Sequence, residues 1–159
     1  MKKFFMGGES ELMLFRLAVD KIYAADRAMR MSCAKRDAAL QCRYLGGNIP
    51  YGFAVDEKTH EFVINEDEAE NVRTAYAMIA GGASYGSVLR YLCKVGAKTR
   101  AGSDFSYTTL QRMLHNEQYN GMYTYNKRGP VDKQIRIPEG MPRIVDAETF
   151  AVVQAVLAA

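Results

Sequence analysis

The stretch Ser84–Gly121, SYGSVLRYLCKVGAKTRAGSDFSYTTLQRMLHNEQYNG, contains two short helical patterns separated by a glycine-containing loop. Ser84 and Ser106 each precede a run of apolar residues at helical spacing, where a hydroxyl can cap the first turn. Gly96 ends the first run. From Ala83 to Arg128 there are seven Lys and Arg residues against two Asp and Glu. A basic helix pair of this kind fits the groove of a nucleic-acid duplex, so the stretch predicts a helix-turn-helix-like pair and a DNA partner.

Charge alternates along the chain around this stretch. The 159 residues carry a net charge of +3, which is ordinary for a soluble protein. Its distribution is more informative, because residues 1–44 carry +4, 45–82 carry −5, 83–128 carry +5 and 129–159 carry −1. This alternation predicts one acidic region and two basic regions that could lie along a polyanion.

Composition excludes several classes of protein. Cys33, Cys42 and Cys93 form no CxxC pair and are odd in number, so we expect reduced thiols and neither a disulfide framework nor a cysteine-rich zinc site. The apolar run within Met1–Met6 ends at Gly7-Gly8-Glu9-Ser10. It is too short for a secretory signal or a membrane span. We therefore expect a cytoplasmic protein without a membrane partner.

The predicted fold class is α+β, with a long N-terminal helix followed by a compact mixed α/β domain that holds the helix pair and short strands. We expect the boundary between residues 1–45 and 46–159, because Gly46, Gly47 and Pro50 break the helical pattern. Asn65 is the expected cap of a helix with Glu68 at the capping-box position. The remaining elements are predicted as strands at 53–55 and 61–64, a helix ending before Gly81-Gly82, a strand at 121–125, a loop at 126–140, a strand at 143–145 and a helix at 147–158.

The long helix has a narrow apolar stripe. Ser10 is its predicted N-cap, and apolar residues recur near 3.6-residue spacing at Leu12, Phe15, Val19, Ile22, Met29 and Cys33. One small domain cannot cover such a stripe, so we expect it to pack on a partner helix or on a domain missing from this chain, and we expect the chain to form a homo-oligomer. A second hypothesis follows, in which the chain is a helical protein-interaction module without DNA specificity of its own.

The second helix of the pair carries the side chains that a recognition helix needs. Arg112 can address guanine, Gln111 or Asn116 can address adenine, and Thr108 or Thr109 can meet a thymine methyl group or a phosphate. Lys98 and Arg100 precede the helix and could contact the DNA backbone, although a solvated loop explains them equally well. An ordinary helical hairpin with a solvated polar face is the alternative for the pair. The predicted DNA-binding residues are Arg30, Arg36, Arg43, Gly46, Gly47, Asn48, Lys98, Arg100, Ser106, Tyr107, Thr108, Thr109, Gln111, Arg112, His115, Asn116, Lys127 and Arg128.

No catalytic constellation is found in the sequence. His60 and His115 have no metal-ligand spacing and no obvious nucleophilic partner. The acidic run Glu66–Glu70 fills a first helical turn, where the helix dipole explains it. Gly81–Ser84 lacks the lysine of a phosphate-binding loop. We expect no catalytic residue, metal, cofactor or small-molecule substrate in this chain.

Gly46–Phe53, GGNIPYGF, resembles the signature that opens the recombinase domain of large serine recombinases, the phage integrases and transposon resolvases. Matching motifs continue in order through Val63–Ala69, residues 99–121 and Pro142–Asp146, with Tyr23, Ala24 and Asp26 resembling the end of the preceding long helix. Phe105 stands where the family usually has Trp, Glu117 where Pro is common, and Ala28 and Arg30 where Ser and Lys are frequent.

The resemblance implies the DNA-binding middle of a recombinase, without the catalytic serine domain or the cysteine-rich zinc ribbon. In that arrangement the long helix positions the catalytic dimer, and the connector Gly46–Pro50 follows the minor groove. Two glycines suit a close approach to the sugar-phosphate wall, and a plain hinge is the competing account. Tyr51 and Phe53 are expected to anchor the core.

Overall fold

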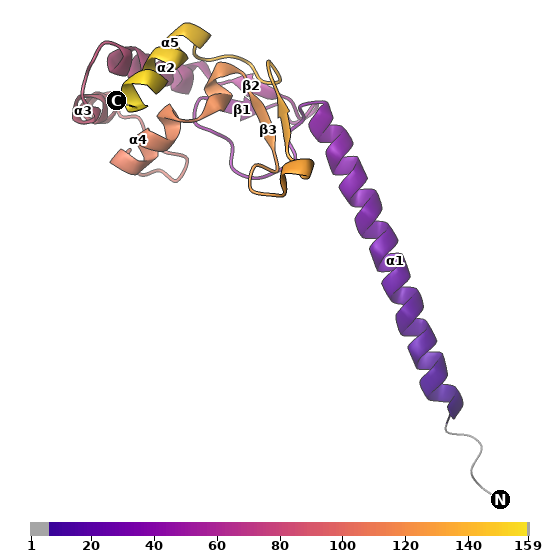
Figure 1. The fold of residues 1–159 in the computed structure, drawn as a ribbon. Coiled ribbons are helices and arrows are strands. Elements are labelled where there is room, and N and C mark those ends of the chain that lie inside the picture. The colour runs from indigo at the N-terminus through magenta and orange to yellow at the C-terminus, as the bar shows by residue number, and fades with distance from the viewer. Residues whose placement is uncertain (1–6, 159) are drawn as a thin grey trace, which may run out of the picture. The chain divides into compact units, whose positions relative to one another are not determined.

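The computed structural model describes residues 7–158 and divides the chain into two units, residues 1–38 and 39–159 (Figure 1). The expectation drawn from Met1–Met6 concerns residues outside the described part. The fold is mixed α/β with a long N-terminal helix, as the sequence predicts. Within residues 7–158 no helix is both long and apolar enough to cross a membrane.

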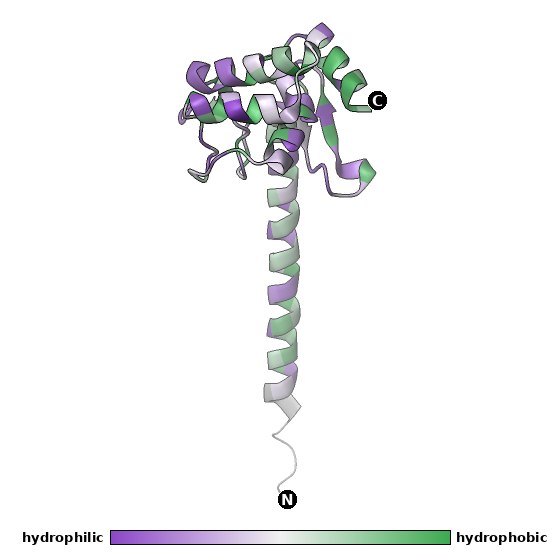
Figure 2. Ribbon diagram, turned by 90° about the vertical axis from the view of Figure 1, so that its left-hand side faces the viewer, coloured by the Kyte–Doolittle hydropathy of each residue, from purple (hydrophilic) through white to green (hydrophobic). Residues whose placement is uncertain are grey.

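Helix α1 (Gly7–Leu40) is the long helix, and it differs from its prediction at both ends. Ser10 lies inside the helix and is not its N-cap, because the two glycines before it adopt helical geometry. The helix ends at Leu40, earlier than the Gly-Gly-Asn-Ile-Pro stretch, and Cys42 follows with a φ of 56°. Apolar side chains of the stripe are exposed along it, as at Leu12, Phe15 and Ile22, and Figure 2 shows hydrophobic segments over its length.

The second unit begins with a two-stranded antiparallel hairpin. Strand β1 (Phe53–Val55) pairs with β2 (Phe62–Ile64), with Phe53 opposite Ile64. The turn between them is closed by the Asp56 carboxylate, which accepts hydrogen bonds from the backbone N–H groups of Lys58 (2.7 Å) and Thr59 (3.1 Å). These two donors lower the pKa of Asp56. Both predicted strands are confirmed within one residue.

Helix α2 (Glu66–Ala80) packs against the C-terminal helix α5 (Ala147–Ala158), and Figure 1 shows the two side by side. Asn65 caps α2 by accepting a hydrogen bond from the backbone N–H of Glu68. The buried residues of α2 include Ala69, Val72, Tyr76 and Ile79, which recur at helical spacing. Local pattern and capping chemistry therefore predicted α2 correctly, and α5 has the predicted bounds.

A second antiparallel hairpin corrects the prediction for the C-terminal third. Strand β3 (Tyr123–Tyr125) pairs with β4 (Ile135–Ile137), which lies inside the segment predicted as a loop. The predicted strand at 143–145 is wrong: Ile144 and Val145 are buried, but their backbone N–H groups both donate to the carbonyl of Tyr119. Apolar residues there reflect burial in the core, and Ile-Arg-Ile was too short a pattern to predict a strand.

The core of the second unit is rich in aromatic side chains. Phe53 is fully buried and its ring stacks on Tyr119 at 5.8 Å, while Tyr119 meets the ring of Tyr76 at 6.0 Å. Burial raises the pKa of both tyrosines well above the ordinary range. Phe53 is thus a core anchor, as expected.

Candidate nucleic-acid interface

The helix pair consists of α3 (Tyr85–Lys94) and α4 (Tyr107–Leu114). Ser84 caps α3 by accepting from the N–H of Ser87 (3.3 Å), and Ser106 caps α4 by accepting from the N–H of Thr109 (3.2 Å). Both predicted caps are confirmed. The connection between the helices covers residues 95–106, which is longer than the three or four residues that join a typical helix-turn-helix.

Helix α4 has one buried face and one exposed face. Leu110, Met113 and Leu114, the apolar residues at helical spacing after Ser106, are buried. The opposite face carries Tyr107, Thr108, Gln111 and Arg112, all exposed, with His115 exposed at the C-cap. A polar face with a guanidinium, an amide and a hydroxyl can donate to phosphates and pair with base edges.

Two neighbouring helices hold the C-terminal end of α4. The Tyr76 hydroxyl on α2 lies within hydrogen-bond distance of two carbonyls of α4, that of Met113 (2.9 Å) and that of Leu114 (3.1 Å). The Gln154 amide on α5 donates to the Leu114 carbonyl at 2.7 Å. These bonds satisfy acceptors that the last turn of a helix leaves free. No local sequence signal pointed to either residue, because each acts from a distant part of the chain.

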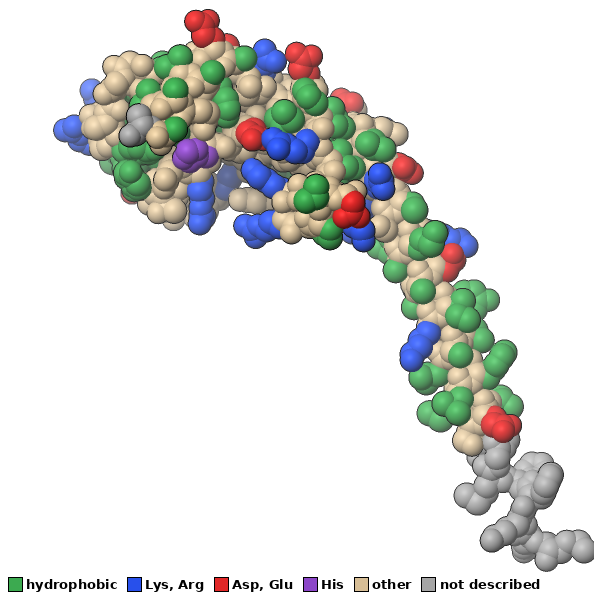
Figure 3. Space-filling model, viewed as in Figure 1, with side chains coloured by type: hydrophobic (Ala, Val, Ile, Leu, Met, Phe, Trp, Pro, Cys, Tyr) green, Lys and Arg blue, Asp and Glu red, His purple; other side chains and the backbone are tan. Residues whose placement is uncertain are grey.

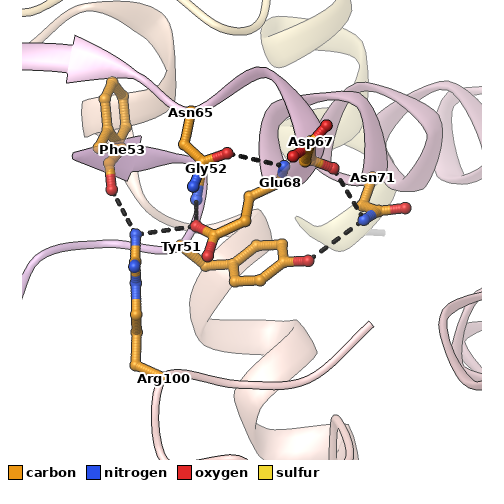
Figure 4. Close-up of polar contacts among 8 residues, drawn as sticks. All are labelled: Tyr51, Gly52, Phe53, Asn65, Asp67, Glu68, Asn71 and Arg100. Carbon is orange, nitrogen blue, oxygen red and sulfur yellow. Dashed lines mark hydrogen bonds and ion pairs between the residues drawn. The ribbon is translucent and has the colours of Figure 1, made fainter. Parts of the chain in front are cut away.

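A small polar network lies directly after the connector, where the chain enters β1 (Figure 4). A single carboxylate oxygen of Glu68 accepts from the Gly52 N–H and from the Arg100 guanidinium, each at 2.8 Å. Arg100 also donates to the Phe53 carbonyl. Glu68 therefore does not close the capping box on Asn65, whose N–H donates to the Gly52 carbonyl instead. The ion pair joins the loop before α4 to the strand and helix that follow the connector.

Aromatic and amide contacts strengthen this attachment. The ring of Tyr51 meets the ring of Phe105 edge-on at 5.0 Å. The Tyr51 hydroxyl accepts a hydrogen bond from the Asn71 amide at 3.2 Å, as Figure 4 shows. Tyr51 is thus held by the loop before α4 and by α2, which agrees with its expected role as an anchor.

The network brings the connector, the loop and α4 around one open groove of about 870 Å³. The predicted site residues that line it come from all three segments: Asn48, Arg100, Ser106, Thr109, Arg112 and Asn116. A smaller hollow of about 390 Å³ adjoins the same helix and is lined by Thr108, Gln111, Arg112, His115, Asn116 and Lys127. Arg112 and Asn116 line both. Figure 3 shows Lys and Arg side chains on either side of a gap between α4 and the β3–β4 hairpin.

The remaining predicted site residues are placed differently. Lys98 pairs with Asp104 at 2.5 Å, which raises the pKa of the lysine. The ring of Tyr107 packs on Tyr85 at 4.6 Å. Gly46, Gly47, Arg43 and Arg128 are exposed in the second unit, and Arg30 and Arg36 are exposed on α1, where Arg30 pairs with Asp26 at 2.8 Å.

The other reactive side chains of the described residues form no metal site and no disulfide. The three cysteines are free thiols, and no group of three His, Cys, Asp or Glu within residues 7–158 could hold a metal ion. In the acidic run at the start of α2, Glu66 (2.9 Å) and Glu70 (3.6 Å) pair with Arg73. Glu66 raises the pKa of that guanidinium.

Comparisons with known proteins agree with this architecture. The family model described as Recombinase matches residues 66–159. A structure described as a crystal structure of an LSR–DNA complex is 23% identical with a TM-score of 0.61, covering 81% of this chain and 38% of that chain. A structure concerning the sequence requirements of the Listeria innocua prophage attP site is 22% identical with a TM-score of 0.60, covering 81% of this chain and 51% of that chain. This chain therefore spans between about a third and a half of the length of these two chains.

Proposed function

The chain belongs to the Recombinase family, and from that premise we propose that it is a DNA-binding domain of a site-specific serine recombinase, which recognises one half of an attachment site. The observation that supports the proposal most is the groove that gathers the connector, the preceding loop and α4. Strand cleavage is assigned to a catalytic serine domain outside these residues, so the chain itself acts by binding.

In this proposal α4 enters the major groove. Arg112 lines both hollows, and among the described residues its guanidinium makes no hydrogen bond or ion pair, so it remains available to a base edge or a phosphate. Lys98 and Arg100 differ, because each is engaged with a carboxylate of the chain. We assign Arg112 and Lys127 as the principal cations of the interface, and Lys98 and Arg100 as residues that shape it.

The connector is proposed to follow the minor groove. Gly46 and Gly47 are exposed, and a Cβ built on either would meet no atom of the chain within 4 Å. The space beside these glycines is therefore open to another molecule. A backbone without side chains can approach the sugar-phosphate wall closely.

Fluorescence anisotropy with labelled duplexes, selected from a random-sequence pool, tests the proposal. Affinity should fall steeply with salt, each neutralised phosphate adding about 0.9 to the logarithmic slope. Arg112→Ala should cost about 1 to 3 kcal/mol on the selected duplex if the side chain reads a base. The matched control is Arg90→Ala, which removes the same charge from α3, outside both hollows, where Arg90 bonds to Gly86 and Ser87.

If Arg112→Ala lowers the affinity for selected and scrambled duplexes equally, Arg112 contacts a phosphate and does not read a base. Equal losses for Arg112→Ala and Arg90→Ala would show that the groove is not the interface. Absence of duplex binding in dilute buffer would overturn the proposal as a whole.

A second function, self-association through α1, has its own supporting observation. Leu12 is 67% exposed, Phe15 69% and Ile22 67%, so a stripe of large apolar side chains has no cover among the described residues of its unit. Exposed apolar stripes of this length usually mark a protein interface. We therefore propose that two copies pair through this stripe.

Sedimentation velocity tests the pairing. Phe15→Asp should shift wild-type dimers toward monomers, because it places a charge inside the stripe. Ala24→Asp is the matched control. Ala24 is exposed on the opposite side of the same helix, and the substitution adds the same charge. A monomeric wild type would contradict the proposed dimer.

A further inference from the structure

His115 lies at the C-cap of α4, and its ring makes one side-chain hydrogen bond. Its Nδ1 lies 3.2 Å from Oε1 of Gln154 on α5. The same Gln154 side chain donates through Nε2 to the Leu114 carbonyl at 2.7 Å. One glutamine thus connects the end of the proposed recognition helix to the imidazole beside it.

The orientation of the Gln154 amide follows from its second partner. A backbone carbonyl can only accept, so the amide NH₂ must face Leu114 and the amide oxygen must face His115. The oxygen in turn can only accept, so Nδ1 of His115 must carry the hydrogen. In a neutral imidazole the other nitrogen, Nε2, is then left as a hydrogen-bond acceptor.

The surroundings make this acceptor distinctive. The hollow that His115 lines has two cations, Arg112 of α4 and Lys127 of the β3–β4 hairpin, together with Thr108, Gln111 and Asn116. The contact from α5 is the uncharged Gln154. Cations donate only, whereas a neutral imidazole with its hydrogen on Nδ1 accepts at Nε2 and cannot donate there. Phosphate oxygens carry no hydrogen, so Nε2 cannot form a hydrogen bond with the DNA backbone phosphates.

We propose that His115, held in one tautomer by Gln154, is a specificity-determining residue that accepts a hydrogen bond from the exocyclic amine of a base. The inference rests on the proposed function and adds the chemical group that is read. In the major groove adenine presents N6 and cytosine presents N4 as donors, whereas guanine presents O6 and thymine presents O4 as acceptors. His115 should therefore favour adenine or cytosine on the strand that it faces. Gln154 acts as a positioning residue.

The tautomer is tested without DNA, by ¹⁵N NMR of the histidine rings in the full chain. The wild-type spectrum at pH 8 should show a protonated Nδ1 and an unprotonated Nε2 for His115, and the same spectrum shows whether the ring is neutral. Gln154→Leu should convert this ring to a tautomer mixture. His60 is the internal reference, because it lies in the β1–β2 turn and its ring makes no hydrogen bond within the described residues. A wild-type ring with the hydrogen on Nε2 would overturn the inference.

Base reading is tested by selection from a pool of random duplexes. At one position the wild type should prefer adenine or cytosine by about two- to tenfold, the range expected for one hydrogen bond. His115→Lys replaces the acceptor by a donor and should transfer that preference to guanine or thymine. His60→Asn, which suits the positive φ of that turn, is the control and should leave the selected sequences unchanged.

The two proposals fail in different ways. If the wild type selects a sequence but His115→Lys selects the same bases at every position, the reading by His115 is wrong and the proposed DNA-binding function stands. If no duplex is bound by the wild type, both proposals are overturned. If the tautomer is the expected one and the preference reverses, the inference is supported.

Discussion

Two glycines only five residues apart serve different purposes. Gly52 has a φ of +94°, and a Cβ built on it would lie 3.0 Å from Ile144 Cδ1 and 3.3 Å from Val72 Cγ2. Gly47 has a φ of +108°, but no atom of the chain lies within 4 Å of its built Cβ. Both positions favour glycine for its backbone, whereas only Gly52 is also required by packing.

We predict that Gly52→Ala destabilises the chain by about 2 to 4 kcal/mol, because backbone strain is added to overpacking against the side chains of Ile144 and Val72. Gly47→Ala should cost only the strain, about 1 to 2 kcal/mol. Urea denaturation followed by circular dichroism measures both. Equal losses for the two variants would contradict the packing role of Gly52.

At the scale of secondary-structure elements, the stability and orientation of helix α4 depend on the helices packed around it. It has eight residues, and isolated helices of this length do not persist in water. Its buried face packs in the core, and its last turn is held by Tyr76 of α2 and Gln154 of α5. The proposed recognition helix is therefore a rigid projection whose orientation is decided by two other helices.

We predict that Tyr76→Phe lowers the free energy of unfolding by about 1 to 2 kcal/mol at neutral pH, because it removes the hydroxyl that bonds to the end of α4. The exposed Tyr107→Phe is the matched control and should change the stability by less than about 0.5 kcal/mol. Thermal denaturation of the three proteins measures the difference. A loss no larger than that of the control would show that the hydroxyl does not hold α4.

Tyr76→Phe should also change how the free energy of unfolding depends on pH in alkaline solution. Burial raises the pKa of Tyr76, so the folded chain keeps this phenol neutral where the unfolded chain would ionise it. Stability from this group is fully present below about pH 10, the ordinary tyrosine value, and is lost as the pH rises beyond it. Wild type should lose stability above about pH 10 faster than Tyr76→Phe. Parallel curves would contradict the assignment.

At the scale of the whole molecule, the hydrophobic core belongs to one unit. Every buried apolar residue within the described part lies between Ala39 and Val153. Both hairpins, the four α-helices α2 to α5 and the groove lie within the described residues of the second unit. Its folding should therefore not depend on residues 1–38, and apolar side chains between Leu12 and Met31 in that unit are exposed and available for association.

We predict that the chain of residues 39–159 unfolds cooperatively within about 5 °C of the full chain and still binds duplex with a steep salt dependence. It should remain monomeric where the full chain associates, and its apparent affinity should be lower because paired copies bind jointly. Calorimetry, sedimentation and anisotropy measure these properties. An unfolded product would contradict the independence of the second unit.

The sequence predicted what depends on neighbours along the chain. Asn65, Ser84 and Ser106 cap the helices that they were expected to cap, and the buried faces of α2 and α4 follow from 3.6-residue spacing. Capping and periodicity are decided within one or two turns. The prediction at Ser10 was wrong because glycines can also occupy the first turn of a helix. The sequence pattern alone does not choose between a helix that begins at Gly7 and one that begins after Ser10.

By itself, then, the sequence determined the family, the mixed α/β class and the polar face of the helix proposed to read DNA. Only the tertiary structure decided that β4 pairs with β3, that Glu68 joins Gly52 to Arg100, and that Gln154 orients His115. The partners in these contacts lie between 10 and 39 positions apart in the chain, from the Tyr125–Ile135 pair to the His115–Gln154 pair. No local preference specifies them, because they form only where burial of the shared core brings distant segments within hydrogen-bond reach.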